Sequence, residues 1–165
     1  MNNQSQKTEE QALNTLAAAC AKREYATGDL DDKMRRWGLT AEERRRVLDQ
    51  LSVRGFYDDE RFCRAYVSDK VRYDKWGRRK IEQGLWLKQV AEEVSRPILD
   101  AVPDEDYLEV LRPMLRSKWR SVKGKNDYER SMKLIKYAMG RGYELRLIRQ
   151  CIDEAEDVDE VWDEG

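Results

Sequence analysis

Three short segments of this chain resemble one another and recur at a nearly constant interval. They span residues 47–51, 98–102 and 151–155, so the offsets between them are 51 and 53 residues. The same offsets bring further positions into register: Leu30 with Ile81 and Leu134, Leu39 with Val90 and Tyr143, and Gly38 with Gln89 and Gly142. Small units of this kind cannot bury their apolar faces alone and must stack on their neighbours. The pattern predicts three divergent copies of one unit.

Each unit is expected to contain three short helices, because the 165 residues include only 3 Pro and 9 Gly and are rich in helix-forming residues. In the first unit, Leu13, Leu16 and Ala17 lie at helical spacing, Thr27 is the expected N-cap of a second helix, and Gly38 is its expected end. The predicted fold is all-α, with three tandem three-helix repeats stacked into an elongated, curved rod. Its expected parts are a disordered N-terminal tail (1–9), three repeats (10–57, 58–103 and 104–155) and an acidic C-terminal tail (156–165).

The second unit begins with an acidic stretch, Asp-Asp-Glu at residues 58–60. Negative charge at a helix start is favoured by the helix dipole, so capping is the expected role rather than metal binding or catalysis. The expected inward face of this helix is formed by Phe62, Ala65 and Tyr66. Pro97 lacks a backbone N–H donor, and a short last helix beginning near Ser95 would accommodate it.

The residue types present argue against an enzyme. The three cysteines (Cys20, Cys63 and Cys151) are widely separated, and the chain has no histidine, which disfavours zinc sites and histidine-assisted nucleophiles. Glycine-rich nucleotide-binding loops are absent as well. We therefore predict no catalytic, cofactor-binding or metal-binding residues. The chain also lacks a run of about 18 apolar residues and an apolar signal-type N-terminus, so no membrane association and a cytoplasmic location are expected.

Charge is strongly segregated although the net charge is only −1. Residues 112–146 contain 11 basic and 3 acidic residues, whereas residues 153–165 contain 8 acidic and no basic ones. The stretch Trp-Gly-Arg-Arg-Lys at 76–80 lies where a helix should begin, with Arg72 and Lys75 just upstream. A helix start flanked by cations suits an anion. The stretch is interpreted either as a contact for phosphate or acidic protein, or as a solvated basic face.

Two further features of the sequence each allow more than one interpretation. A second basic group surrounds Trp119 and consists of Arg116, Lys118, Arg120, Lys123 and Lys125. Cations around an aromatic ring can bind single-stranded nucleic acid by charge and stacking, but Trp119 could equally form the apolar face of a helix. In the tail, Val158, Val161 and Trp162 lie at helical spacing. They either continue the last helix or form a docking peptide or a tether that competes for the basic face.

Residues 55–67, Gly-Phe-Tyr-Asp-Asp-Glu-Arg-Phe-Cys-Arg-Ala-Tyr-Val, resemble the central signature of the RecX regulatory proteins, and Gly-Arg-Arg-Lys-Ile at 77–81 follows at the expected distance. The resemblance covers roughly residues 10–155. Its signature positions, expected to be structural, are Asp58, Asp59, Arg61, Phe62, Tyr66 and Gly77. The chain departs from the family pattern at Gln89, where many members have glycine, at Pro97 and in the acidic tail.

The resemblance implies three tandem three-helix repeats, no cofactor and a role in modulating RecA. RecX-like proteins lie along the groove of the RecA–DNA filament and usually lower its ATP hydrolysis, strand exchange and coprotease activity. A monomeric regulator of homologous recombination, DNA repair and the SOS response is therefore expected, with weak affinity for DNA free of RecA. The alternative is a sequence-independent DNA-binding helical module. The candidate contacts for RecA or DNA are Arg72, Lys75, Arg78, Arg79, Lys80, Arg116, Lys118, Arg120, Lys123 and Lys125.

Overall fold

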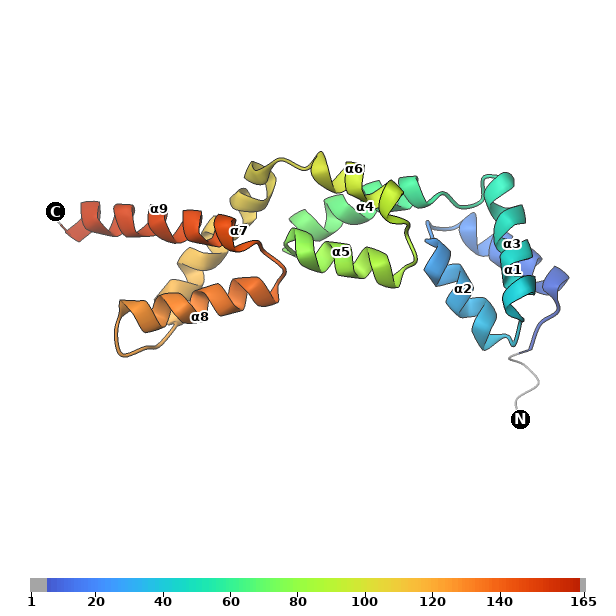
Figure 1. Ribbon diagram of the computed structural model, residues 1–165, viewed down its shortest axis with the longest axis horizontal. Helices are drawn as coiled ribbons and strands as arrows, with labels where there is room; N and C mark the ends of the chain where they lie inside the picture. Colours follow the sequence, from blue (N-terminus) through green and yellow to red (C-terminus); the bar gives the residue numbers. More distant parts are fainter. Residues whose placement is uncertain (1–5, 164–165) are drawn as a thin grey trace. The chain divides into compact units, whose positions relative to one another are not determined.

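The computed structural model describes the backbone of residues 6–163 and the side chains of residues 6–155, and every element in this part of the chain is a helix (Figure 1). The helices are α1 (Glu9–Cys20), α2 (Thr27–Arg36), α3 (Ala41–Val53), α4 (Asp59–Arg72), α5 (Arg78–Leu87), α6 (Glu92–Asp100), α7 (Asp104–Ser121), α8 (Asp127–Gly140) and α9 (Leu145–Asp163). The predicted all-α repeat fold is confirmed, while the elongated, curved shape stays a prediction. No helix in this described part is long and apolar enough to span a membrane.

The second helix of each repeat ends in the same way. Gly38, Gln89 and Gly142 follow α2, α5 and α8 with positive φ angles of 80°, 56° and 91°. The next residue in each case is buried, and its N–H donates to a carbonyl five residues earlier, at 3.1 to 3.2 Å. This is the Schellman ending of a helix, which needs one left-handed residue. The alignment of the three repeats is therefore confirmed at the level of backbone conformation.

The chain divides into two compact units. Unit one contains the described residues up to Tyr66 together with Gly84–Ile98, and unit two contains Val67–Gln83 together with the described residues from Leu99 onward. The division passes through α4, α5 and α6. The central repeat therefore contributes one part of itself to each unit.

Unit one has an apolar core in which α1 and α2 pack against α3. Its buried members are Ala12, Leu16, Leu30, Met34, Leu39, Val47 and Leu51. The start of α3 carries a capping box, because the Thr40 hydroxyl accepts from the Glu43 N–H and the Glu43 carboxylate accepts from the Thr40 N–H. These reciprocal bonds satisfy backbone donors that would otherwise lack partners at the helix start.

Capping at the start of α2 differs from the prediction. The N-cap residue is Ala26, whose N–H donates to the Asp29 carboxylate at 3.0 Å. Thr27 is the first helical residue, and its N–H and hydroxyl both donate to Asp59, at 2.9 and 2.7 Å. Asp58 alone caps α4, where it accepts from the Glu60 N–H. The acidic stretch thus caps two helices, one of them distant in sequence.

Two other local predictions were wrong. Ala65 is exposed, whereas Cys63 is fully buried, because the buried stripe of α4 runs through Phe62, Cys63, Val67 and Val71 and leaves position 65 on the outer side. Helix α6 begins at Glu92 and carries Pro97 within it. Pro97 has no N–H to donate to the carbonyl four residues earlier, so this helix lacks one backbone hydrogen bond.

The structure describes the two ends of the chain in part. Helix α1 begins at Glu9 behind a Thr8 capping box, and the Lys7 N–H donates to the Trp37 carbonyl at 3.2 Å. The remainder of the predicted N-terminal tail lies outside the described residues. At the other end, the α9 backbone is helical to Asp163, whereas the side chains of Val158, Val161 and Trp162 lie outside the described part.

Unit two is held together by contacts of α9 with α7 and α8. Its buried side chains include Tyr107, Leu108, Leu111 and Leu115 of α7, Leu134 and Ala138 of α8, and Leu147, Ile148 and Cys151 of α9. These residues follow the helical spacing that an amphipathic helix requires. This packed core holds the backbone that carries the basic residues of α8 and of the first part of α5.

Candidate anion-binding surface

The start of α5 is held against the end of α8 within unit two. The Gly77 N–H donates to the Arg141 carbonyl at 2.8 Å, and the Arg79 N–H donates to the Gly142 carbonyl at 3.1 Å. A Cβ atom on residue 77 would overlap with the backbone of Gly142, which explains why glycine occupies this position. These two N–H groups of the helix start are used inside the protein and are therefore not available to an anion.

The turn before α5 is fixed by an arginine from the third repeat. Arg141 donates from Nε to the Lys75 carbonyl at 3.2 Å and from Nη2 to the Asp74 carbonyl at 2.8 Å. Lys75 itself has a left-handed backbone, with φ at 58°. Sequence reasoning missed Arg141 as a member of this site. Its alignment next to Gly142, at the end of a repeat helix, was the available signal.

The indole ring of Trp76 contacts two lysines, Lys70 from α4 and Lys80 from α5. The ammonium groups of Lys70 and Lys80 lie 4.4 and 4.6 Å from the centroid of the half-buried indole ring. Such cation–π contacts are worth about 0.5–1 kcal/mol at exposed sites. Lys70 also forms an ion pair with Asp74 at 3.0 Å. The indole therefore holds two positive charges at defined places beside the turn.

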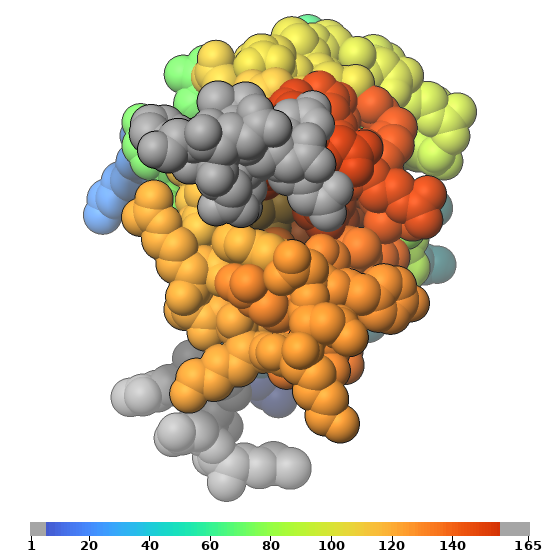
Figure 2. Space-filling model, turned by 90° about the vertical axis from the view of Figure 1, so that its left-hand side faces the viewer, coloured from blue at the N-terminus to red at the C-terminus, as the bar shows by residue number. Residues whose placement is uncertain are grey.

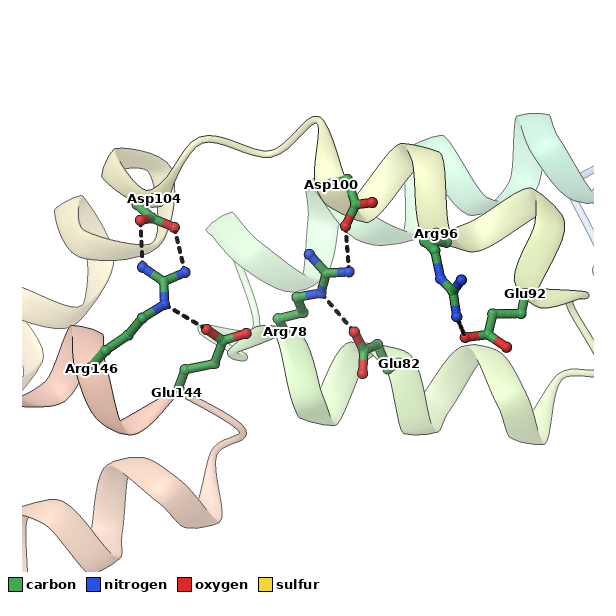
Figure 3. A network of polar contacts seen from close by, with 8 residues as sticks. All are labelled: Arg78, Glu82, Glu92, Arg96, Asp100, Asp104, Glu144 and Arg146. Atoms are coloured by element: carbon green, nitrogen blue, oxygen red, sulfur yellow. Dashed lines mark hydrogen bonds and ion pairs between the residues drawn. The ribbon is translucent and has the colours of Figure 1, made fainter.

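Arg78 does not belong to this surface, although the sequence made it a candidate contact. Its guanidinium pairs with Glu82 and Asp100, both at 2.6 Å (Figure 3). The hydrogen bond to Glu82 is the main cause of the raised pKa of Arg78. Figure 3 also shows Arg146 paired with Asp104 and Glu144, so acidic partners neutralise both arginines.

Several cations remain exposed around Trp76. Within the described part of the chain, Arg72, Lys75 and Arg79 are exposed and form no ion pair. We define the Trp76 cluster as Lys70, Arg72, Lys75, Trp76, Arg79, Lys80 and Arg141. Apart from Lys70, which pairs with Asp74, its cations form no ion pair within the described residues. A surface of this composition attracts anions through both long-range charge and direct contact.

The second predicted group, around Trp119, is only partly joined to this cluster. The Arg130 guanidinium lies 3.8 Å from the Trp119 ring centroid and donates to the Trp119 carbonyl at 2.7 Å. Trp119 is therefore half-buried and covered on one face, which makes it a poor platform for stacking. Lys118 lies 4.6 Å from the ring centroid of Tyr137, and Arg141 lies 6.0 Å from the same ring. Tyr137 thus links Lys118 to the Trp76 cluster.

The other cations of that group stay at the surface of the α7–α8 region. Arg116, Arg120, Lys123 and Lys125 are exposed, and Figure 2 shows the orange side chains of this region projecting from the molecule. The Lys123 carbonyl accepts a hydrogen bond from Lys133. These residues add positive charge to unit two, but no described contact connects them directly to Trp76.

The predicted signature residues have structural contacts inside the two units. Arg61 pairs with Glu24 at 2.7 Å, and Phe62 stacks with Tyr66 at 5.5 Å between ring centroids. The Tyr66 hydroxyl occupies the space that a side chain at Gly84 would need. Together with the capping bonds of Asp58 and Asp59, these contacts fix the first part of α4 within unit one.

The cysteines have the character of small apolar residues. Cys63 and Cys151 are buried, and burial raises the pKa of each thiol to about 11. Such thiols are poor nucleophiles at neutral pH because the thiolate is scarce. Among the described residues, no group of three or more histidine, cysteine or acidic side chains is arranged to hold a metal ion.

Comparisons with known proteins agree with this architecture. Two family models match the chain: "RecX, second three-helix domain" over residues 58–96 and "RecX, third three-helix domain" over residues 104–152. The chain is 26% identical over 143 residues to "Regulatory protein RecX" of Prosthecochloris aestuarii, covering 87% of this chain and 92% of that protein. It is also 26% identical over 146 residues to "Regulatory protein RecX" of Acinetobacter baylyi, covering 88% and 89%.

Solved structures show the same fold. A crystal structure of regulatory protein RecX superposes with a TM-score of 0.80 at 17% identity, covering 88% of this chain and 73% of that one. The crystal structure of RecX from Lactobacillus salivarius gives a TM-score of 0.78 at 14% identity, covering 90% and 96%. At these identities the superpositions support the fold, and the family models together with the sequence relatives support the family.

Proposed function

Because the chain belongs to the RecX family, we propose that it binds the RecA–DNA filament and lowers RecA's ATP hydrolysis, strand exchange and coprotease activity. The supporting observation is the Trp76 cluster, in which two repeats of unit two supply cations to one surface. A filament of RecA on DNA offers phosphates and acidic protein groups as complementary charges. The proposal includes a monomeric, cytoplasmic protein without enzymatic activity that acts in DNA repair, homologous recombination and the SOS response.

The geometry of the Trp76 cluster supports contact with a fixed anionic surface. Hydrogen bonds from Arg141 hold the turn at Lys75, and cation–π contacts hold Lys70 and Lys80. Side chains that are ordered before binding lose less conformational entropy when they meet a partner. Exposed charges also accelerate encounter, and that contribution weakens as salt rises.

The first test is single-stranded-DNA-dependent ATP hydrolysis by the cognate RecA, titrated with this protein below the RecA concentration. Inhibition by substoichiometric amounts is expected, because one bound molecule would affect many neighbouring subunits of a filament. An unchanged ATPase rate and filament length would contradict the proposal.

The contribution of the cluster is tested with the double variant Arg79→Glu/Lys80→Glu. Its affinity for RecA-coated DNA should fall at least tenfold in low salt, and the loss should shrink as salt rises. The matched control is Arg45→Glu/Arg54→Glu, which reverses two exposed charges in unit one. Equal losses in both variants would show that only net charge matters.

The alternative is a sequence-independent DNA-binding helical module. The exposed cations of the α7–α8 region favour it, since phosphate contacts require only positive charge at the surface. It predicts tight binding to bare DNA with a steep dependence on salt. The filament proposal instead predicts weak binding to bare DNA and strong binding to RecA-coated DNA.

A further inference from the structure

Tyr73 is a large aromatic side chain left open to solvent at the edge of the Trp76 cluster. It follows directly after α4, and 79% of it is exposed. Its sequence neighbours include the exposed cations Arg72 and Lys75. Leaving a tyrosine ring in water forgoes the free energy of burying its apolar surface. The position is therefore suited to a ligand that offers both a flat ring and negative charge.

The backbone that carries Tyr73 is well fixed. The N–H groups of Tyr73 and Asp74 both donate to the Asp69 carbonyl, at 2.8 and 3.3 Å, and the Trp76 N–H donates to the Lys70 carbonyl at 2.9 Å. Arg141 adds two hydrogen bonds to the following carbonyls. The ring thus projects from an ordered turn, which lowers the entropic cost of using it in binding.

The two aromatic rings of this turn are in different situations. Trp76 is half-buried and contacts Lys70 and Lys80. Tyr73 takes no part in the ring–ring or cation–π contacts found among the described residues. Trp76 therefore organises the cations, while the Tyr73 ring is the one with accessible faces.

We propose that Tyr73 stacks on a base of a single-stranded nucleic acid while the cations of the Trp76 cluster contact its phosphates. Every base offers a π-face, so such stacking tolerates any sequence. In a duplex the base faces are covered by their neighbours, which makes an unpaired or unstacked strand the ligand that this ring can use. The inference rests on the proposed function only in taking nucleic acid as part of the partner.

The experiment uses the full chain without RecA, in low salt, and two labelled oligonucleotides of about 12 nucleotides, a length within the usual site size of single-strand binders. One is oligothymidine, and the other has abasic sites with the same number of phosphates. Fluorescence anisotropy should show roughly tenfold tighter binding to oligothymidine, as expected for one aromatic–base stack.

Three variants assign the preference to Tyr73. Tyr73→Ala should bind both oligonucleotides equally, whereas Tyr73→Phe should keep the preference because the ring is retained. Tyr128→Ala is the matched control, since Tyr128 is 75% exposed but lies between Asp127 and Glu129. Removing this second exposed tyrosine should leave the preference unchanged.

The outcomes separate this inference from the proposed function. Equal binding of both oligonucleotides by the unmodified chain, or binding of neither, overturns the inference. So does a preference that survives Tyr73→Ala. If RecA ATPase inhibition persists in any of these cases, the filament proposal stands and the Trp76 cluster meets phosphate or acidic protein instead. If the unmodified chain does not inhibit the RecA ATPase, the filament proposal is contradicted, whereas the oligonucleotide result still tests the role of Tyr73.

Discussion

The same contact between repeats occurs once in each unit, and the two versions differ in chemistry. In the α2–α5 junction of unit one, the Gly28 N–H donates to the Lys88 carbonyl at 2.7 Å. In the α5–α8 junction of unit two, the Gly77 N–H donates to the Arg141 carbonyl at 2.8 Å. Both carbonyls belong to the residue just before the left-handed position that ends the repeat helix. The backbone geometry is therefore shared.

Side chains make the two junctions different. In the α2–α5 junction, Lys88 pairs with Asp29 at 2.6 Å and Gln89 donates to Asp31 at 3.0 Å. In the α5–α8 junction, Arg141 instead donates to backbone carbonyls, which carry no net charge. Positive charge is therefore neutralised at the first junction and left available at the second. The repeat contact therefore contains charge pairs in unit one and an arginine bonded to backbone carbonyls in unit two.

The largest effect is expected from the glycines at the two contacts. A Cβ atom on Gly28 would lie 2.5 Å from the Lys88 carbonyl carbon, and one on Gly77 would overlap with Gly142. Backbone atoms cannot move aside easily, so Gly28→Ala and Gly77→Ala should each lower the free energy of unfolding by about 3 kcal/mol. The change in the free energy of unfolding is measured by urea denaturation, with circular dichroism as the signal.

The control for both variants is Gly140→Ala. Gly140 is the last residue of α8, and no atom lies within 4 Å of a Cβ built there. Alanine should be neutral or stabilising by up to about 1 kcal/mol, because it favours helix over the flexible glycine. A loss at residue 140 equal to that at residue 77 would argue against close backbone approach as the cause.

A smaller effect is expected from Asp31, which belongs to the α2–α5 junction alone. Only 5% of it is exposed, and Arg44 donates to its carboxylate at 2.8 Å. Burial by itself raises the pKa of Asp31, but the hydrogen bonds of Gln89 and Arg44 and the nearby positive charges outweigh it, so the pKa is lowered. Asp31→Asn should cost about 2 kcal/mol at neutral pH.

The pH dependence of this cost has a definite sign. A carboxyl whose pKa is lower in the folded state stabilises the protein above its unfolded pKa of about 3.9, and this contribution is lost as pH falls through the folded value. The stability difference between Asp31→Asn and the unmodified chain should therefore narrow below about pH 4. The exposed neighbour Asp32 is the control, and Asp32→Asn should stay within about 0.5 kcal/mol of the unmodified chain at neutral pH.

The sequence predicted the parts of this comparison that depend on local signals. Glycine at a helix end and apolar residues at helical spacing located the repeat and the positions of Gly38, Gln89 and Gly142. The partners across the junctions were not predictable, because they depend on which repeat ends meet in space. Arg78 was assigned to the contact surface but pairs with Asp100, and Arg141 was overlooked although it holds the cluster's turn.

The smallest effect concerns Gln89, where the two junctions differ at an equivalent backbone position. Its φ of 56° strains a residue with a Cβ, whereas Gly142 adopts φ 91° without that cost. The Gln89 side chain compensates by donating to Asp31 at 3.0 Å. Gln89→Gly should therefore change stability by less than about 0.5 kcal/mol, since relief of strain and loss of one hydrogen bond are each worth about 1 kcal/mol. In an Asp31→Asn background, the same substitution should stabilise by up to about 1 kcal/mol, because a weaker hydrogen bond is lost while the same backbone strain is relieved. A double-mutant cycle measured by urea denaturation isolates this difference, and equal effects of Gln89→Gly in both backgrounds would mean that the left-handed glutamine is not held by Asp31.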